Sequence, residues 1–506
     1  MLSTITSLGL QGIHGYVVCV ECDLSSGLPA FDMVGLPDAV VRESRGRVRS
    51  AIKNCGFDFP LSRITVNLAP ADLKKEGALY DLPILLGLLS AAGQIRTPGA
   101  ECAFLGELGL DGALRRITGV LPMALCAQRE GITTLFVPEE NANEATLAKG
   151  VTVYGVRHIS ELIAHLRGER ALCPTPEWQP PRVFCNGADF ADVKGQENVK
   201  RALEIAATGG HNILMVGPPG AGKSMLARRI PTILPDMTYE ESIATTEIHS
   251  VCGLTGRDNP FVVQRPFRSP HHTVSTVALA GGGMPLRPGE ISVAHNGVLF
   301  LDELPEFSRD ALEAMRQPLE DGEITVSRAS GSFTFPASFM FVGAMNPCKC
   351  GWYGHPSARC TCSRGEIERY IGRLSGPMLD RIDMHVEVPA VHYDELSARE
   401  PGEPSRVIRE RVNEGRLIQT ERFSGTNVTC NARMTAPMLA EFCRLDDAAD
   451  ALLRAAFDKL KLTGRSHAKI LRIARTIADM AHSEDIHAPH IAEAIQFRTL
   501  DRGGIG

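Results

Sequence analysis

The stretch ILMVGPPGAGKS, residues 213–224, decides the fold. Four apolar residues lead into GPPGAGKS, which matches the pattern GxxxxGK[S/T], and the helical run MLARRI follows. In such a loop the backbone amides hold phosphates, the lysine reaches the outer phosphates and the hydroxyl binds Mg²⁺. A glycine-rich turn that carries Lys-Ser by chance is the alternative, and the flanking strand and helix disfavour it. We expect a phosphate loop made by Gly217, Pro218, Pro219, Gly220, Ala221, Gly222, Lys223 and Ser224.

Two further apolar runs predict neighbouring strands of one parallel sheet. VLFLDEL (298–304) carries Asp302 and Glu303 at its end, and SFMFVGAMN (338–346) ends at Asn346. Ligand sites of parallel α/β sheets form at the carboxyl ends of the strands. We expect Asp302, beside Ser224, to hold Mg²⁺ through water. Glu303 would polarise the attacking water and Asn346 would orient it, although either acid alone could instead cap the next helix.

Two arginines are suited to neutralise the charge that develops in phosphoryl transfer. Arg381 lies in LSGPMLDRIDMHVEV (374–388), and Arg465 opens a helix in TGRSHAKILRIAR (463–475). The alternative for each is a surface ion pair, which contributes little to stability.

Four of the 14 cysteines fall in NPCKCGWYGHPSARCTC (346–362), directly after the third strand. Two CxC pairs, joined by a connector long enough to fold back, suit tetrahedral Zn²⁺, with His355 as a substitute ligand. An intramolecular redox pair and unligated surface thiols are the alternatives. A closed four-ligand site leaves no open position for catalysis, so we expect a structural clip. Its ligands would be Cys348, Cys350, Cys360 and Cys362.

The composition is that of a globular protein of about three domains, because the chain has 506 residues of which 44% are hydrophobic. No apolar run is long enough to span a membrane, and the N-terminus lacks a secretory signal pattern. We therefore expect a cytoplasmic protein with reduced thiols. The net charge of −6 neither indicates nor excludes a nucleic-acid partner.

A proline-rich segment divides the chain. ALCPTPEWQPPRVFCNG (171–187) contains four prolines, which cannot continue a helix or a central strand. Mixed α/β sequence precedes it, parallel α/β sequence follows, and the chain is helical from about residue 434 onward. We expect four segments, which comprise residues 1–168, 169–187 (the linker), 188–392 and 393–506.

These motifs together resemble an AAA+ ATPase. The run from 265 to 307 resembles the magnesium-chelatase-like branch, and nearly the whole chain resembles the ComM/YifB family. That resemblance implies ATP and Mg²⁺ as cofactors, a ring, expected to be a hexamer, and ATP sites between subunits. Arg381 would act as a finger in the neighbouring subunit's site, and Arg465 as the sensor in a helical lid formed by residues 393–506.

The N-terminal region, 1–168, resembles the α+β, S5-type proteolytic domain of Lon. GELGLDGALRRITGVLPMALCAQREGI (106–132) and the KKEG within LAPADLKKEGALYDLP (68–83) carry the likeness. Where the protease has its serine this chain has Ala78-Leu79-Tyr80, and VLPMAL (120–125) has no lysine. A Ser-Lys dyad needs both members, so we expect a scaffold without proteolytic activity.

Three functions are compatible with an ATPase ring. The family resemblance implies a DNA motor, a helicase that drives branch migration in homologous recombination during natural transformation. A hairpin predicted in GEITVSRASGSFTFP (322–336) could track phosphates through Arg328 in a ring's pore. A basic run supports the same partner with Arg454, Lys459, Lys461, Arg465, Lys469, Arg472 and Arg475. An ordinary surface hairpin and a solvated basic helix are the alternatives, and a chelatase subunit or a protein-remodelling ATPase are the competing functions.

Overall fold

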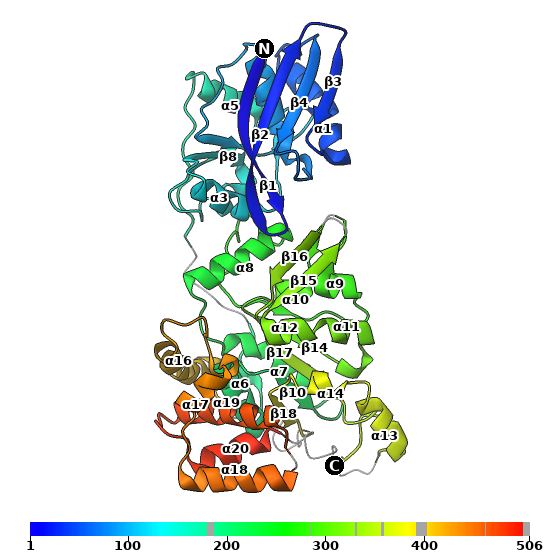
Figure 1. Cartoon of the computed structure of the whole chain (residues 1–506), viewed down its shortest axis with the longest axis vertical. Helices are drawn as coiled ribbons and strands as arrows, with labels where there is room; N and C mark the ends of the chain where they lie inside the picture. Colours follow the sequence, from blue (N-terminus) through cyan, green and yellow to red (C-terminus); the bar gives the residue numbers. More distant parts are fainter. Residues whose placement is uncertain are drawn as a thin grey trace. The chain divides into compact units, whose positions relative to one another are not determined.

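The computed structural model describes residues 1–179, 187–284, 286–328, 331–355, 359–390, 402–460 and 462–498. The chain forms two compact units (Figure 1). Unit 1 comprises Met1–Arg182, Thr238–Val263 and Gly283–Pro288, and unit 2 comprises Val183–Met237, Gln264–Gly282 and Gly289–Gly506. Residues 180–186 of the predicted linker lie outside the described residues, and the three boundaries between the four predicted segments remain predictions.

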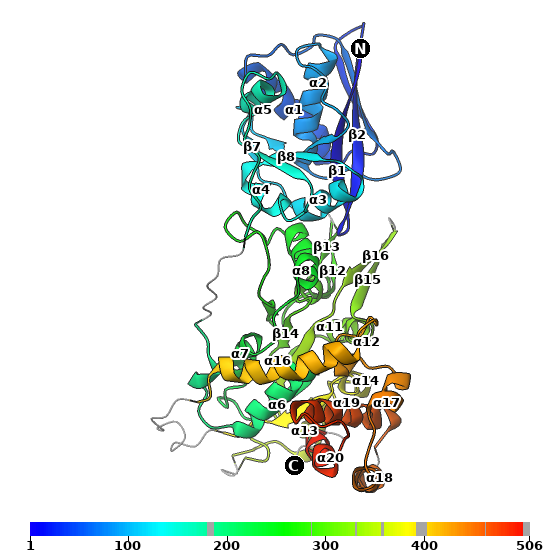
Figure 2. The same cartoon turned by 90° about the vertical axis from the view of Figure 1, so that its left-hand side faces the viewer.

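Unit 1 is built on a mixed seven-stranded sheet in the order β3-β4-β2-β1-β5-β8-β9. Val18, Val20 and Cys22 alternate with less buried residues along β2, so one face of this strand lies in the core. The helices α1 and α2 lie on one side of β1 and β2 (Figure 2). The strands are β1 Leu2–Gln11, β2 His14–Ser25, β3 Ala30–Val34, β4 Arg63–Ala69, β5 Cys102–Phe104, β8 Thr134–Pro138 and β9 Thr152–Val156.

Unit 1 also contains short strands and several helices. The ribbon pairs β6 with β7, and every residue of α2 is buried. The bounds are η1 Ala78–Tyr80, β6 Glu107–Leu108, β7 Leu114–Arg115, β13 Arg287–Pro288, α1 Ala39–Asn54, α2 Asp81–Ala91, α3 Val120–Arg129, α4 Glu139–Ala145, α5 Ile159–Leu166 and α8 Tyr239–Val251.

Helix α8 joins unit 1 although its sequence follows the phosphate loop. Leu121, Leu147 and Phe261 form a small apolar cluster beside it. The buried carboxylate of Glu144 accepts hydrogen bonds from the Ser250 hydroxyl and from Thr255 Oγ1 (3.2 Å). The sequence did not predict this placement of residues 238–263.

Unit 2 contains the predicted parallel sheet, in the order β11-β14-β17-β10-β18. The three predicted strands are confirmed as β10, β14 and β17, and every residue in them is buried. Complete burial means that both faces of the sheet are covered, as expected for parallel sheets. The strands are β10 Ile213–Val216, β11 Phe267–Arg268, β14 Val298–Leu301, β17 Met340–Met345 and β18 Met384–Glu387.

The predicted hairpin is confirmed as β15 paired antiparallel with β16. It stands at the margin of unit 2, away from β10 and β18 (Figures 1 and 2). The side chain of Arg328 lies outside what the structure describes. Bounds here are α6 Glu197–Gly209, α7 Lys223–Arg229, α9 Thr276–Ala280, β12 Gly281–Gly282, α10 Glu290–Val293, α11 Arg309–Ala314, α12 Arg316–Asp321, β15 Glu323–Arg328, β16 Gly331–Pro336, α13 Arg364–Ile371 and α14 Gly376–Leu379, with 3₁₀ turns η2 Phe190–Asp192, η3 Ile230–Thr232 and η4 Leu304–Glu306.

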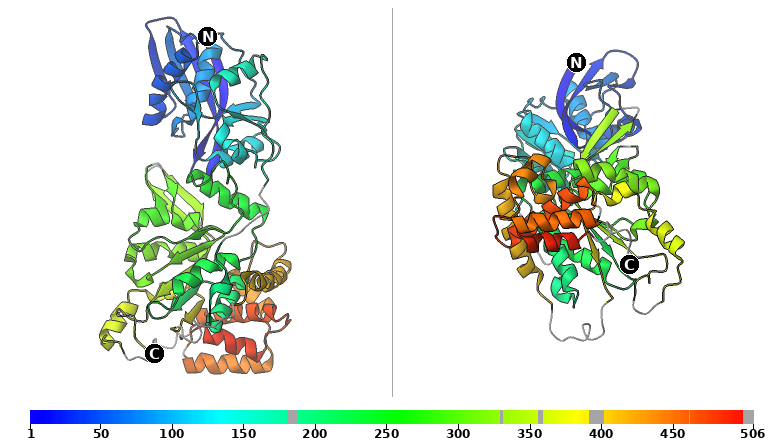
Figure 3. Two further views of the ribbon diagram at one scale, coloured as in Figure 1. Left: turned by 180° about the vertical axis from the view of Figure 1, so that it is seen from behind. Right: turned by 60° about the horizontal axis from the view of Figure 1, so that its bottom comes forward.

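The C-terminal part of unit 2 is helical, as predicted (Figure 3). Its apolar side chains and those of the parallel sheet belong to one buried core. Shared burial of this kind makes the helices and the sheet depend on each other for stability. The elements are α16 Ser405–Arg422, η5 Asn431–Arg433, α17 Ala436–Phe442, α18 Asp447–Leu460, α19 Gly464–Met480 and α20 Ala488–Gln496.

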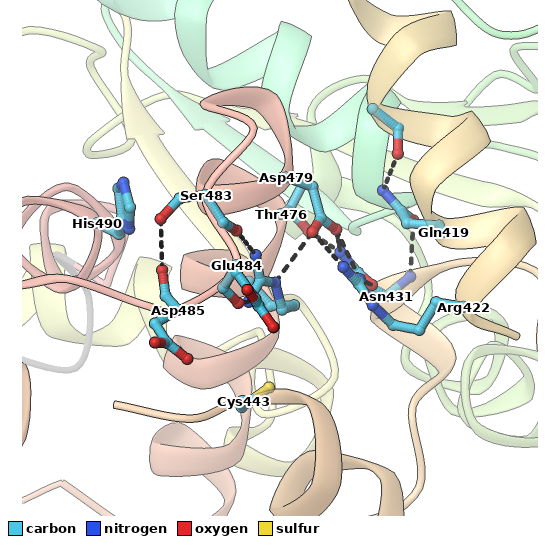
Figure 4. A network of polar contacts seen from close by, with 12 residues as sticks. Gln419, Arg422, Asn431, Cys443, Thr476, Asp479, Ser483, Glu484, Asp485 and His490 are labelled. Atoms are coloured by element: carbon cyan, nitrogen blue, oxygen red, sulfur yellow. Dashed lines mark hydrogen bonds and ion pairs between the residues drawn. The ribbon is translucent and has the colours of Figure 1, made fainter. Parts of the chain in front are cut away.

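A buried polar network fixes α19 to its neighbours (Figure 4). The Asp479 carboxylate accepts from Arg422 Nη1 at 2.7 Å, Asn431 Nδ2 at 2.7 Å and Arg475 Nε at 3.0 Å. Asp479 and Arg475 are 1% and 2% exposed. A buried charge is tolerated when partners of this kind satisfy it.

Across the described ranges, we find no helix that combines the length and the apolar composition needed to cross a membrane.

Candidate nucleotide-binding site

The phosphate loop, residues 217–224, joins β10 to α7 as the sequence predicts. Gly222 has φ +85°, a left-handed conformation that favours glycine, and the helix begins at the next residue. The loop borders a cavity of about 370 Å³. That cavity is lined by Pro219, Gly220, Ala221, Gly222, Lys223, Ser224, Met225, Asp302, Glu303, Met345 and Asn346.

The ammonium group of Lys223 is held by uncharged acceptors. Nζ donates to the carbonyl oxygens of Gly217 (2.7 Å) and Pro218 (2.9 Å) and to Asn346 Oδ1 (3.1 Å). Burial lowers the pKa of Lys223, and the Asp302 and Glu303 carboxylates oppose that shift. A partly desolvated cation facing neutral oxygens is suited to an anionic ligand such as a phosphate.

Ser224 and Asp302 lie where the predicted Mg²⁺ ligands should be. Ser224 Oγ donates to Asp302 Oδ2 at 2.5 Å, so one hydroxyl and one carboxylate oxygen are already adjacent. Hard oxygen ligands of this kind fit Mg²⁺, which is held by few protein groups together with phosphates and water. The two residues therefore fit the ion.

Glu303 has an unusual backbone. Its φ is +51°, a left-handed conformation that costs a non-glycine residue about 1–2 kcal/mol. Its amide donates to Asp302 Oδ1 at 3.0 Å, and its side chain is 57% exposed. The carboxylate is thus directed by local geometry while it stays accessible to water.

His272 is a site residue that sequence reasoning missed. Its Nδ1 lies 3.5 Å from Glu303 Oε2. The sequence around His271 and His272 does not predict this contact, because only the fold brings these histidines close to the end of β14. His272 is placed to orient the Glu303 carboxylate.

Asn346 directly follows β17 and reaches the same cavity. The Asn346 backbone hydrogen-bonds the Tyr370 hydroxyl, and burial raises the pKa of Tyr370 to about 12. The phenol therefore stays protonated at neutral pH and supports Asn346 from α13.

The two predicted arginines each lie near a carboxylate of this chain. Within the described part of the chain, the residues lining the cavity do not include Arg381 or Arg465. Arg381 Nη2 lies 2.5 Å from Glu320 Oε1, and Arg465 Nη1 lies 3.9 Å from Asp380 Oδ2. Lys469 of α19 also donates to the Ile382 carbonyl at 2.9 Å, so the helix holds the backbone next to Arg381.

The four cysteines of the predicted metal clip come together in unit 2. One sulfur from each lies within 4.8 Å of all the others. Among the described residues, this group consists of the cysteines and does not include His355. The cysteine cluster is Cys348, Cys350, Cys360 and Cys362.

The Lon-like positions of unit 1 are apolar or aromatic. Leu79 and Tyr80 of η1 are buried, and α3 begins at Val120. Burial raises the pKa of Tyr80 well above its usual value, so its hydroxyl is not a nucleophile at neutral pH. The absence of proteolytic activity stays a prediction.

Only some of the basic residues between 454 and 475 are exposed, so the prediction that they form one basic surface is wrong in part. Lys469 and Arg475 are buried and bind backbone carbonyls and Asp479. Arg454, Lys459 and Arg465 are exposed, whereas Lys461 lies outside the described residues. The sequence pattern was misleading because charged side chains of α19 donate hydrogen bonds to acceptors inside the protein.

Three families match consecutive parts of the chain. Magnesium chelatase, subunit ChlI, matches residues 189–396; subunit ChlI of Mg-chelatase matches residues 20–141; and the ChlI C-terminal family matches residues 402–498. The chain is 43% identical to competence protein ComM of Haemophilus influenzae over 509 residues, covering 99% of this chain and 98% of that protein. It is 43% identical to YifB of Escherichia coli over 504 residues, covering 99% and 98%. Lon protease of Mycolicibacterium smegmatis is 29% identical over 142 residues, 27% of this chain and 18% of the protease.

Proposed function

This chain belongs to the ComM/YifB family of magnesium-chelatase-type AAA+ ATPases, and from that premise we propose that it is an ATP-hydrolysing ring motor that acts on DNA. The proposal rests on one observation. The side chains needed for ATP hydrolysis line the same cavity, and they are Lys223, Ser224, Asp302, Glu303 and Asn346. Its cofactors are ATP and Mg²⁺, and the cysteine cluster is assigned to structural Zn²⁺.

The residues of the cavity divide the work of hydrolysis. Lys223 exchanges its carbonyl partners for phosphate oxygens, while Ser224 and Asp302 would hold Mg²⁺. When bound, the ion neutralises charge on the phosphates. Glu303 accepts the proton of the attacking water, and Asn346 orients that water.

Shared sites in a ring account for the arginines. Arg381 and Arg465 lie on neighbouring backbone, close to Asp380, and outside the lining of the chain's own cavity. We assign Arg381 to the site of the next subunit in a hexamer, and Arg465 to the sensor of the helical lid. A guanidinium there would neutralise charge on the transferring phosphoryl group.

DNA is the proposed track. The Haemophilus influenzae relative is a competence protein, which is consistent with branch migration in homologous recombination during natural transformation in the cytoplasm. The hairpin β15–β16 precedes the strand that carries Asn346, so movement of the hairpin can follow the state of the ATP site. Arg454, Lys459 and Arg465 are exposed cations available to phosphates.

The second candidate is a chelatase subunit or a protein-remodelling ATPase. The magnesium-chelatase families match the N-terminal, ATPase and helical regions and favour it. The N-terminal region also resembles Lon protease over 142 residues, and that likeness counts against a simple chelatase motor.

The test is conversion of synthetic three- and four-stranded DNA junctions into their products by the pure full-length protein. Wild type with ATP and Mg²⁺ should convert junctions, with tighter binding at low salt because phosphate contacts release counterions. Glu303→Gln is the matched control, which should bind junctions without moving them. A protein that forms rings and hydrolyses ATP, yet neither binds nor moves any junction, would favour the remodelling function.

A further inference from the structure

The sulfur atoms of the cysteine cluster have the spacing of ligands around one metal ion. Cys348 Sγ lies 3.3 Å from Cys350 Sγ and 3.8 Å from Cys360 Sγ, and the latter two are 3.6 Å apart. Four sulfurs about 2.3 Å from a tetrahedral zinc would be separated by about 3.8 Å. A disulfide requires about 2.05 Å, and all four cysteines are free thiols.

The backbone around the cluster directs donors at the sulfurs. Cys350 Sγ is hydrogen-bonded by the backbone of Trp352, within the connector, and of Thr361, between Cys360 and Cys362. Amide groups aimed at a sulfur stabilise a metal-bound thiolate and orient it. The cluster is therefore a set of soft ligands with a supporting shell, which favours Zn²⁺ over hard cations.

The cluster is also attached to the phosphate loop. Gly351, next to Cys350, has φ +86° and donates its amide to the Cys348 carbonyl at 3.0 Å. A Cβ placed on Gly351 would lie 2.6 Å from Cδ of Pro219, so the Gly351 backbone packs closely against the Pro219 ring. The turn over residues 348–351, which carries the first two sulfurs, thus supports one wall of the cavity.

A second attachment runs through Asn346. This residue lies two positions before Cys348, and its Oδ1 accepts from Lys223 Nζ at 3.1 Å. Helix α13 begins at Arg364, two residues after Cys362, and returns Tyr370 to the Asn346 backbone. Both ends of the cysteine segment therefore meet at a residue of the ATP cavity.

We propose that the cysteine cluster binds one Zn²⁺ and that this ion, by holding Gly351 against Pro219 and Asn346 against Lys223, sets the affinity of the cavity for nucleotide. The coupling rests on the proposed nucleotide site, whereas the metal site stands on the sulfur geometry. Without the ion, the turn is held by hydrogen bonds alone, and the wall of the cavity loses the support of the metal–sulfur bonds.

The first measurement is elemental analysis and nucleotide titration of the full-length protein. Wild type should contain about one zinc per chain. Cys360→Ser/Cys362→Ser should lose the zinc and bind a fluorescent ADP analogue about tenfold or more weakly. Cys173→Ser, at an exposed cysteine outside the cluster, should keep both the zinc and the affinity. Circular dichroism of each variant checks that the fold is retained.

Gly351→Ala separates the two parts of the proposal. Its methyl group meets Pro219, and φ +86° is strained for alanine, so the variant should bind nucleotide more weakly. It should keep the zinc, because all four sulfur ligands remain. Wild type without zinc, or with the four sulfurs in disulfides, would overturn the metal site. Zinc loss in the double variant with unchanged affinity would overturn the coupling. A wild type that holds zinc but binds no nucleotide would contradict the proposed ATPase function and leave the metal site established.

Discussion

Arg465 Nη1 lies 3.9 Å from Asp380 Oδ2, which places the arginine of α19 beside the residue that precedes Arg381. Arg381 and Arg465 are more than 80 residues apart in the sequence, yet the Arg465 side chain approaches the residue next to Arg381. Arg465 is 66% exposed, so it is free to change partners when another surface approaches. Of the two, we assign Arg381 to the neighbouring subunit's site and Arg465 to the sensor of the helical lid.

Arg381→Ala should reduce ATP hydrolysis by about 10³-fold or more, because the finger supplies charge at the transferring phosphoryl group. Mixing Arg381→Ala subunits with Lys223→Ala subunits should restore part of the activity, since some interfaces then combine an intact finger with an intact cavity. Steady-state ATPase assays of the mixtures measure this. Absence of recovery in every mixture, with co-assembly verified, would rule out the shared site.

Lys223→Ala and Glu303→Gln should fail at different steps. The first variant should lose nucleotide binding, because no cation remains to meet the outer phosphates. The second should bind nucleotide but hydrolyse it about 10²–10⁴-fold more slowly, since an amide cannot accept the proton of water. Binding is measured by titration and hydrolysis by phosphate release, and full activity in both variants would contradict the assigned roles.

Asp479→Asn should destabilise unit 2 by about 3–5 kcal/mol, because it leaves the buried Arg475 and the half-buried Arg422 without their counter-charge. Urea unfolding followed by circular dichroism measures the change. Asp458→Asn is the matched control, because Asp458 is exposed on α18. Equal stability of the two variants would show that the network contributes little.

Unit 2 should lose stability in mild acid through His211. Burial lowers the pKa of His211 to about 4, although Asp383 opposes the shift. The unfolded chain binds a proton near pH 6.5 and the folded chain does not, so stability present at pH 7 falls as the pH drops from about 6.5 toward 4. The loss by pH 5 should be about 2 kcal/mol from this residue.

Urea unfolding at several pH values measures this dependence. His211→Gln should flatten the decline between pH 7 and 5, whereas His14→Gln, at an exposed position of β2, should not. An unchanged slope in His211→Gln would assign the acid sensitivity to other groups. Burial also lowers the pKa of His295 to about 4, so part of the decline should remain.

The strands and cavity of unit 2 could be predicted because their sequence signals are local. β10 and β14 are uninterrupted apolar runs, which only a sheet covered on both faces accommodates, and each carries its functional residues at its carboxyl end. Because the strands are parallel, their carboxyl ends lie at the same edge of the sheet. The same local rule predicted that Ser224 and Asp302 would meet.

The features that the sequence did not predict depend on tertiary partners. Helix α8 has apolar residues that fit any core, and nothing in its own pattern selects unit 1. Lys469 and Arg475 looked like surface charges because their buried acceptors are backbone carbonyls and a distant aspartate. His272 reaches Glu303 only through the path of the segment between β11 and α9.

The inclusion of residues 238–263 in unit 1 has a consequence for how the protein can be divided. The chain changes unit after residues 182, 237, 263, 282 and 288, so a protease that cuts only the proline-rich linker cannot release either unit. A shortened protein that begins after the linker would keep Phe261 and lose Leu121 and Leu147, its partners in the apolar cluster. The N-terminal region is therefore interlaced with the ATPase sequence, and neither can be exchanged between proteins by one junction.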